Sequence, residues 1–178
     1  ALEGCDALFH CGAAYSLWRR DARWMLDSNV QGTVNILEAA RDQGVEDIVY
    51  TSSVAAIGKK KGPEPGNEEY RMEPDHIIGP YKRSKYLAEM KAMEFAESGL
   101  PVRIVNPSTP VGPYDAKPTP TGRIILDYLN GKVPAYLDTG LNLIDVGDCC
   151  IGHLLAIEKG VPGRRYILGN RNIALREI

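Results

Sequence analysis

The sequence predicts an α/β fold with a mainly parallel sheet, because short apolar runs alternate with amphipathic helical patterns along the chain. The apolar runs suit strands that are buried on both faces. They occupy residues 6–11, 47–53, 102–106 and 165–168. Helical patterns fill much of the space between them, at residues 23–42, 81–98 and 148–159. At 178 residues with 44% hydrophobic content, the chain is expected to form a single domain.

The first strand and helix are each bounded by glycines. The run at 6–11 lies between Gly4 and Gly12, which is typical of a short buried strand. Apolar residues then recur at helical spacing over 23–42, and Gly44 supplies a stop. This part of the chain therefore predicts one strand followed by one helix.

The second unit contains the features on which the functional argument depends. The strand at 47–53 turns polar at its carboxyl end, which is the end where ligands bind in open α/β sheets. A long loop with glycines and prolines is expected over 54–80. An uninterrupted helical pattern then runs over 81–98 and ends before Gly99.

The remaining elements are shorter. The strand at 102–106 is broken by Pro107, and a loop is expected from there to Gly122. After it we predict a helix at 123–130, a short strand at 135–137, a helix at 148–159 that Asp148 caps, and a strand at 165–168. Residues 172–178 are typical of the cap and first turn of another helix.

Composition excludes several classes of function. The net charge is -2, with acidic and basic residues mixed along the chain, so no nucleic-acid partner is expected. No apolar run approaches the length of a membrane span. The four cysteines have no metal-ligand spacing, so we expect no metal, reduced thiols and a cytoplasmic location.

Ser53, Tyr81 and Lys85 are the candidate catalytic residues. Ser53 ends a strand, and Tyr81 and Lys85 are four residues apart at the start of the next helix, so both can point to one side of it. A phenol is a poor base at neutral pH, but a nearby ammonium favours the phenolate. Ser53 can then orient a substrate oxygen. This set predicts acid/base chemistry at an alcohol or a carbonyl.

The Tyr-x-x-x-Lys spacing alone is a weak signal, since Tyr128 and Lys132 match it as well. Between those two residues lies Asn130-Gly131, where a helix should end, and no strand-end serine accompanies them. Only the first pair has the strand, serine, loop and helix in order. We therefore interpret Tyr81 and Lys85 as the functional pair.

The sequence resembles the extended short-chain dehydrogenase/reductases, a superfamily of NAD-dependent sugar epimerases, dehydratases and dihydroflavonol-reductase-like enzymes. The matching segments, in order, are residues 9–14, 29–33, 51–53, 81–85 and 106–108. Within this superfamily, residues 15–18, 106–110, 117–123 and 138–142 are most similar to bacterial hopanoid-associated sugar epimerases. The resemblance implies a Rossmann-like, doubly wound sheet and the cofactor NAD or NADP.

The resemblance also implies roles for individual residues. Tyr81 would be the acid/base, Ser53 would steady the reacting oxygen, and Lys85 would lower the pKa of Tyr81 and hold the nicotinamide ribose. Asn29 would support the catalytic set. The implied cofactor-binding residues are Cys11, Gly12, Ala13, Ser52, Tyr81, Lys85, Pro107 and Ser108, and the candidate substrate contacts are Asn106 and Arg123. Family members commonly form a homodimer through the helices that here would be 23–42 and 81–98.

Two departures from the family pattern limit what the resemblance implies. The glycine-rich turn that follows the family's first strand is absent, as is the residue that selects NAD or NADP, so we expect a partial chain that lacks the first strands. Val54-Ala55-Ala56 follows Ser53 where dehydratases carry an Asp-Glu pair, which disfavours dehydration. Residues 1–178 are thus expected to be part of one NAD(P)-binding domain, with substrate-binding elements in about 109–145.

Three functions remain open at this stage. The leading hypothesis is an NAD(P)-dependent epimerase or reductase that moves a hydride at a secondary alcohol or ketone of a small, sugar-like substrate. The second is a dihydroflavonol-reductase-like carbonyl reductase that uses NADPH. The third is a non-catalytic dinucleotide-binding scaffold or an inactive fragment, because a fold does not by itself give a function.

Overall fold

A computed structural model describes residues 1–16, 19–58, 60, 62, 64–73, 76–116 and 118–177. Parts of the segments that carry the family resemblance, Leu17, Trp18 and Lys117, lie outside these ranges, as do Lys59, Lys61 and Ile178. Among the described residues, no helix is long and apolar enough to cross a membrane.

The main sheet has four parallel strands, in the order β1-β2-β3-β6. These are β1 (Ala7–His10), β2 (Asp47–Thr51), β3 (Val102–Pro107) and β6 (Arg165–Leu168). All four were expected from the sequence, as was the parallel pairing. Because the strands run in one direction, the residues that follow β1, β2 and β3 meet at one edge of the sheet.

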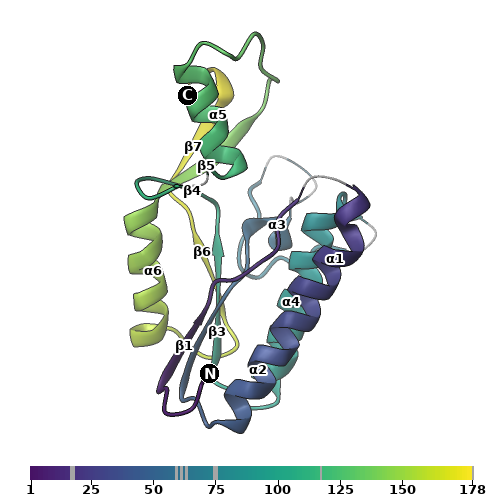
Figure 1. Ribbon diagram of the computed structural model, residues 1–178, viewed down its shortest axis with the longest axis vertical. Coiled ribbons are helices and arrows are strands. Elements are labelled where there is room, and N and C mark those ends of the chain that lie inside the picture. Colours follow the sequence, from purple (N-terminus) through teal and green to yellow (C-terminus); the bar gives the residue numbers. More distant parts are fainter. Residues whose placement is uncertain are drawn as a thin grey trace.

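Helices cover both faces of this sheet (Figure 1). On one face lie α1 (Ala22–Leu26), a π-helical turn (Asp27–Gln31), α2 (Gly32–Asp42) and α4 (Pro80–Glu97). On the other lies α6 (Val146–Lys159). The predicted helix at 23–42 is therefore continuous but contains a π-helical turn, a feature that often marks functional positions.

Side chains of the strands alternate between two cores, as the pleat of a strand requires. Ile48 and Tyr50 face the larger core, which is shared with α2 and α4 and includes Leu37 and Ala88. Val49 instead packs with Val105 and Ala156 toward α6. This arrangement explains why the strands read as continuous apolar runs.

A second, smaller sheet was missed by the sequence analysis. It consists of β4 (Thr109–Val111), β5 (Gly140–Asp145) and β7 (Arg171–Ala174), with β4 parallel and β7 antiparallel to β5. The loop expected from Pro107 to Gly122 and the helix start expected at 172–178 were therefore partly wrong, because β4 and β7 occupy part of these segments. Pro110 is tolerated because β4 is an edge strand of this sheet. The strand predicted at 135–137 does not form, and β5 forms instead.

Three shorter elements also differ from the predictions. The expected loop after Ser53 contains a short helix, α3 (Val54–Ile57). Helix α5 (Pro120–Leu129) begins three residues before the predicted start at Arg123, with Thr119 as its N-cap. Helix α6 is capped by Asp145, whose carboxylate accepts a hydrogen bond from the Gly147 N–H at 2.7 Å, and not by Asp148. Short 3-10 segments lie at Arg19–Asp21 and Leu175–Glu177.

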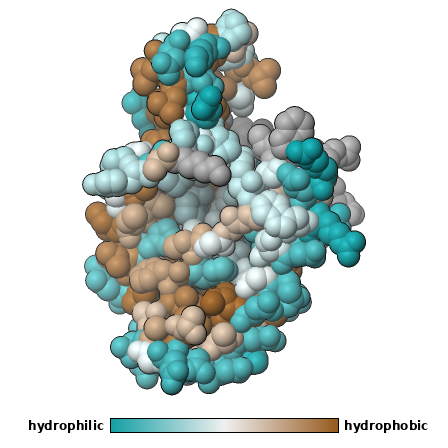
Figure 2. All heavy atoms as spheres, in the orientation of Figure 1, coloured by the Kyte–Doolittle hydropathy of each residue, from teal (hydrophilic) through white to brown (hydrophobic). Residues whose placement is uncertain are grey.

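Exposed apolar side chains gather over α6 and over the part of the molecule that contains α5 (Figure 2). On α6 they are Ile151, Leu154 and Leu155. On α5 they are Ile124, Leu126, Tyr128 and Leu129. The two helices expected to form a dimer interface contribute only Trp24 to the large exposed apolar residues.

Candidate active site

Ser53 lies directly after β2, at the edge where the parallel strands end. Its backbone is extended, with φ -166° and ψ 153°, and its Oγ accepts a hydrogen bond from the Ala55 N–H at 3.2 Å as the N-cap of α3. The hydroxyl proton of Ser53 is thereby left to donate elsewhere. The local structure thus presents Ser53 as a fixed hydrogen-bond donor.

Tyr81 and Lys85 reach this edge from the first turns of α4, which begins with Pro80 in a position that suits proline. Tyr81 and Ser53 form a side-chain hydrogen bond. Lys85 is only 3% exposed, and its ammonium donates to the Thr51 carbonyl oxygen at 2.8 Å. The structure therefore brings the three predicted catalytic residues together at the end of β2.

Burial controls the protonation of this group. The pKa of Tyr81 is raised above its ordinary value, mainly because burial disfavours the phenolate, and the hydrogen bond with Ser53 only partly opposes this. Burial also lowers the pKa of Lys85 to about 8, against the charges of Glu89 and Cys11. Burial thus raises the pKa of Tyr81 overall, and the lowering of this pKa by Lys85 that the resemblance implies stays a prediction.

Tyr15 is a neighbour of Tyr81 that the sequence analysis did not assign to the site. The two rings meet edge to face, with centroids 4.5 Å apart. Tyr15 follows Ala13 and Ala14, and it encloses the phenol of Tyr81. The signal for it in the sequence is that Tyr15 begins the resembling segment 15–18, directly after the segment 9–14.

Asn29 fixes the loop that carries these residues. It is buried in the π-helical turn, and its side chain pairs with both backbone groups of Ala14: Oδ1 accepts from the N–H at 2.6 Å and Nδ2 donates to the carbonyl at 2.9 Å. Its Nδ2 also donates to Ser84 Oγ at 2.9 Å. Asn29 thus ties the segment after β1 to α4, between Tyr81 and Lys85, which suits the supporting role the resemblance implies.

The predicted cofactor-binding residues lie at the ends of the same strands. Cys11, Gly12 and Ala13 follow β1, Ser52 follows β2, and Pro107 ends β3 with Ser108 after it. Three buried side-chain oxygens in this region have no hydrogen-bond partner among the described residues: Ser52 Oγ, Asn106 Oδ1 and Ser108 Oγ. Buried polar atoms ordinarily have partners, so this edge fits a ligand with many polar groups, such as a dinucleotide.

The two candidate substrate contacts lie in different surroundings. Asn106 is fully buried, and its Nδ2 donates to Glu89 Oε2 at 2.6 Å and to the Ser53 carbonyl at 3.0 Å. This placement favours a supporting role over direct contact with a substrate. Arg123 is exposed on α5 and pairs with Asp127 at 3.2 Å. In the described structure the ion pair of Arg123 is with a residue of its own helix, and the structure gives no hydrogen bond from Arg123 to Ser53, Tyr81 or Lys85.

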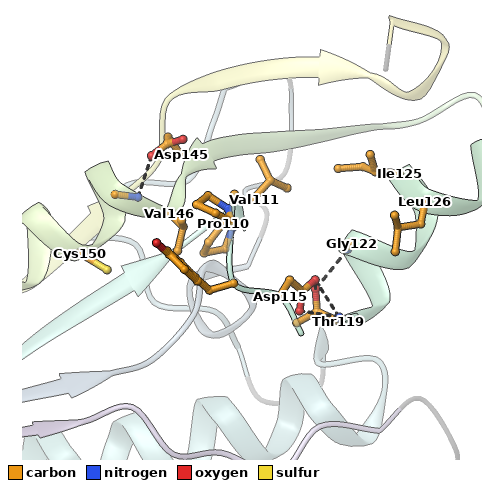
Figure 3. Close-up of a pocket in the computed structure, with 14 residues that line it drawn as sticks. Pro110, Val111, Asp115, Thr119, Gly122, Ile125, Leu126, Asp145, Val146 and Cys150 are labelled. Carbon is orange, nitrogen blue, oxygen red and sulfur yellow. Dashed lines mark hydrogen bonds between the residues drawn. The ribbon is translucent and has the colours of Figure 1, made fainter. Parts of the chain in front are cut away.

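A cavity of about 1000 Å³ lies between β4, α5 and the start of α6 (Figure 3). Its lining is largely apolar and includes Val111, Ile125, Leu126 and Val146. None of Ser53, Tyr81 and Lys85 lines it. The charged residues of its described lining are two aspartates, Asp115 and Asp145. Both already accept hydrogen bonds from their own turns, from Thr119 and Gly147 respectively.

Cys11 has polar neighbours that no sequence pattern indicated. Thr51 Oγ1 donates to Cys11 Sγ at 3.4 Å and lies 3.0 Å from His153 Nε2. His153 Nδ1 donates to the Cys149 carbonyl oxygen at 2.8 Å. The hydrogen bond with His153 is the main reason that the pKa of Cys11 is lowered, although burial acts in the opposite direction. The described residues contain no group of His, Cys, Asp and Glu that could hold a metal ion.

This environment predicts selective alkylation of Cys11. At neutral pH, iodoacetamide should label Cys11 faster than the exposed Cys5, and His153→Gln should slow the labelling of Cys11 by about tenfold, because the thiolate is the reacting form. Peptide mass spectrometry over a time course measures both rates in one sample. Equal effects of His153→Gln on Cys5 and Cys11 would contradict the assignment.

The arrangement defines the class of protein. A parallel sheet with helices on both faces is the fold of the short-chain dehydrogenase/reductase structures that the chain resembles. The family model described as "NAD dependent epimerase/dehydratase family" matches residues 1–169. The chain belongs to this family.

Individual relatives agree with this placement. The chain is 52% identical over 181 residues to a Synechocystis protein named "Putative dihydroflavonol 4-reductase". The aligned region covers 99% of this chain and 53% of that protein. Among solved structures it is similar to gox2253, with 50% identity, a TM-score of 0.92 and coverage of 98% of this chain and 53% of that one. It is also similar to DesIV of Streptomyces venezuelae, a dTDP-glucose 4,6-dehydratase solved with NAD, with 28% identity, a TM-score of 0.85 and coverage of 99% and 56%. The chain thus spans about half the length of these relatives.

Proposed function

We propose that the full protein is an NAD(P)-dependent carbonyl reductase, which moves a hydride between the cofactor and a ketone or secondary alcohol. The observation that carries this proposal is the convergence of Ser53, Tyr81 and Lys85 on the end of β2. Their chemistry is proton transfer at an oxygen atom, and a bound nicotinamide would supply or accept the hydride. The family's dependence on NAD supports the same proposal.

Each residue has a distinct role in this proposal. Tyr81 gives a proton to the substrate oxygen during reduction, since its raised pKa keeps it a neutral phenol at physiological pH. Ser53, whose Oγ accepts from the Ala55 N–H, has one hydroxyl proton, and in the reaction it donates this proton to the substrate oxygen. Lys85 has three N–H donors, one of which goes to Thr51, so the others can hold ribose hydroxyls. Cys11, Gly12, Ala13, Ser52, Pro107 and Ser108 would border the cofactor.

The cavity beside α5 is not lined by Ser53, Tyr81 or Lys85, so in this proposal it receives the part of the substrate that lies away from the reacting carbon, and its lining favours a reductase over a sugar-nucleotide epimerase. A sugar nucleotide carries a diphosphate, which proteins usually bind with arginine or lysine side chains. The described lining of the cavity contains two aspartates and no basic residue, and is otherwise mostly apolar. This supports an uncharged, partly apolar carbonyl substrate. The name of the Synechocystis relative supports the same substrate class.

The hopanoid-associated sugar epimerase remains the second candidate, because the family as a whole includes epimerases. The substrate-binding elements would then be those proposed at about 109–145. A homodimer through residues 23–42 and 81–98 and a cytoplasmic location also remain proposals. Trp24 is the large exposed apolar residue that the described helices would bring to this dimer interface.

Cofactor turnover separates the candidates. We expect the full-length protein to consume NADPH or NADH when it is given an uncharged aryl or alkyl ketone, with one alcohol formed per cofactor oxidised. Interconversion of sugar nucleotides without net cofactor consumption would support the epimerase instead. Binding of dinucleotide with no turnover of either substrate class would favour a non-catalytic scaffold.

A further inference from the structure

Two buried charged residues, Glu89 and Arg165, lie near the candidate catalytic residues and have no role in the proposed function. Glu89 on α4 is 0% exposed, and it forms an ion pair with Arg165 on β6 at 3.1 Å. The side chain of Arg165 is also buried, and its Nη2 donates to the backbone carbonyls of Glu68 and Tyr70. Burial of two charges is costly, so such a pair is weak evidence for stability alone.

The second carboxylate oxygen of Glu89 leads toward Ser53. Asn106 Nδ2 has two protons, and it donates one to Glu89 Oε2 at 2.6 Å and the other to the Ser53 carbonyl at 3.0 Å. Three elements that are distant in the sequence, α4, β3 and the end of β2, are joined in this way. The hydrogen bonds fix the backbone of the residue whose hydroxyl meets Tyr81.

Glu89 also shares a face of α4 with Tyr81 and Lys85, the two candidate catalytic residues on this helix. Tyr81, Lys85 and Glu89 are spaced four residues apart, so their side chains follow one another along the helix. Lys85 interacts with the charge of Glu89 from α4, with Cys11 and His10 from β1 and its end, and with the ring of Tyr50 from β2 at 5.3 Å. Among these groups, Glu89 is the carboxylate.

We propose that Glu89 is a positioning residue for the reaction: through Asn106 it holds Ser53 in place, and its negative charge faces the Lys85 ammonium. This inference rests on the proposed function, since it assigns its roles to the same three catalytic residues. It extends that function by giving the buried Glu89–Asn106–Arg165 cluster a purpose in activity. Arg165 then serves to neutralise Glu89 within the core.

The proposed effect of the Glu89 charge on Lys85 can be measured without any turnover. Burial lowers the pKa of Lys85, and the charge of Glu89 acts against that effect. In full-length protein, Glu89→Gln should therefore lower the pKa of Lys85 by about one pH unit in an NMR titration of its side chain. The matched control is Arg165→Met, which removes the opposite charge of the same ion pair and should leave this pKa unchanged or raise it. Both variants lose the ion pair, so a purely structural effect would move them in the same direction.

The link from Asn106 to Ser53 is tested by a double-mutant cycle. We expect Asn106→Ala to reduce kcat by about tenfold when Ser53 is present, and by less than about twofold in the Ser53→Ala background. Each rate is divided by the folded fraction from circular dichroism, so loss of folded protein does not count as loss of activity. If Glu89→Gln folds poorly, the double variant Glu89→Gln/Arg165→Met removes both buried charges and takes its place, with a smaller fall in the Lys85 pKa.

Two results would overturn the inference: equal shifts of the Lys85 pKa in the Glu89 and Arg165 variants, or an equal fall of kcat on Asn106→Ala in both Ser53 backgrounds. Neither result would affect the proposed function, provided that turnover still depends on Tyr81. If turnover does not depend on Tyr81, the proposed function fails on its own evidence, and the NMR titration still reports on Glu89 and Lys85.

Discussion

Replacing Tyr81 with phenylalanine should reduce kcat of the full-length protein by about 10²–10⁴-fold, the contribution expected of a positioned general acid. The substitution removes one oxygen atom and leaves the aromatic ring. The ring contact with Tyr15, at 4.5 Å between centroids, is therefore kept, as is the packing of α4 against the sheet. The loss should appear in kcat with a much smaller change in the affinity for the dinucleotide.

Tyr128→Phe is the matched control for this experiment. Tyr128 begins the second Tyr-x-x-x-Lys match, but it is 58% exposed and α5 ends one residue later, at Leu129. We expect turnover close to that of the unmodified protein. Steady-state kinetics on both variants, with folding checked by circular dichroism, give the comparison. Near-normal turnover of Tyr81→Phe would remove Tyr81 from the chemistry.

The parts of the fold that could be predicted from sequence are those with local signals. Helix α4 has a regular apolar pattern that ends before Gly99, and β2 is a continuous apolar run. The second sheet was not predicted, because its strands lack the continuous apolar runs of the main sheet: β4 has three residues, one of them Pro110, and β7 begins with the polar pair Arg171-Asn172. The alternation Leu141-Asn142-Leu143 was the available sign of β5.

The grouping of the candidate catalytic residues Ser53, Tyr81 and Lys85 could be predicted, because their order along the chain places them at one edge of the sheet. Glu89 could not, because a glutamate four residues after a lysine on a helix is ordinarily solvent-exposed. Its burial depends on Arg165, which lies 76 residues away in the sequence. Asn106 was predicted to contact substrate, and only the packing of β3 against α4 reveals its bonds to Glu89 and Ser53.

Replacing Lys85 with methionine should reduce turnover strongly while changing the free energy of unfolding little. Lys85 is buried, and its pKa falls from 10.5 in the unfolded chain to about 8 in the folded protein. At pH 7 the ammonium is charged in both states, and the lowered pKa corresponds to a penalty of about 3 kcal/mol on folding. Methionine removes this penalty, but it leaves the Thr51 carbonyl oxygen without its donor, which costs about 1–3 kcal/mol. The two effects oppose each other, so the free energy of unfolding should stay within about 2 kcal/mol of the unmodified protein.

The free energy of unfolding should depend on pH through the lowered pKa of Lys85. Between about pH 8 and 10.5 the unfolded chain binds a proton that folded Lys85 has released, so the penalty from Lys85 declines as the pH rises through this window. Lys85→Met should lack this gain, and urea unfolding at pH 7 and pH 9.5 measures it as a difference between the two proteins.

Turnover of the variant should fall by at least about 10²-fold, because methionine cannot donate to a ribose hydroxyl. Lys91→Met, at an exposed position of the same helix, is the control and should change neither property. A fall in the free energy of unfolding of Lys85→Met at pH 7 well beyond 2 kcal/mol would mean that Lys85 mainly supports the fold, because a residue kept for activity at a cost in stability should not destabilise the protein strongly when it is replaced.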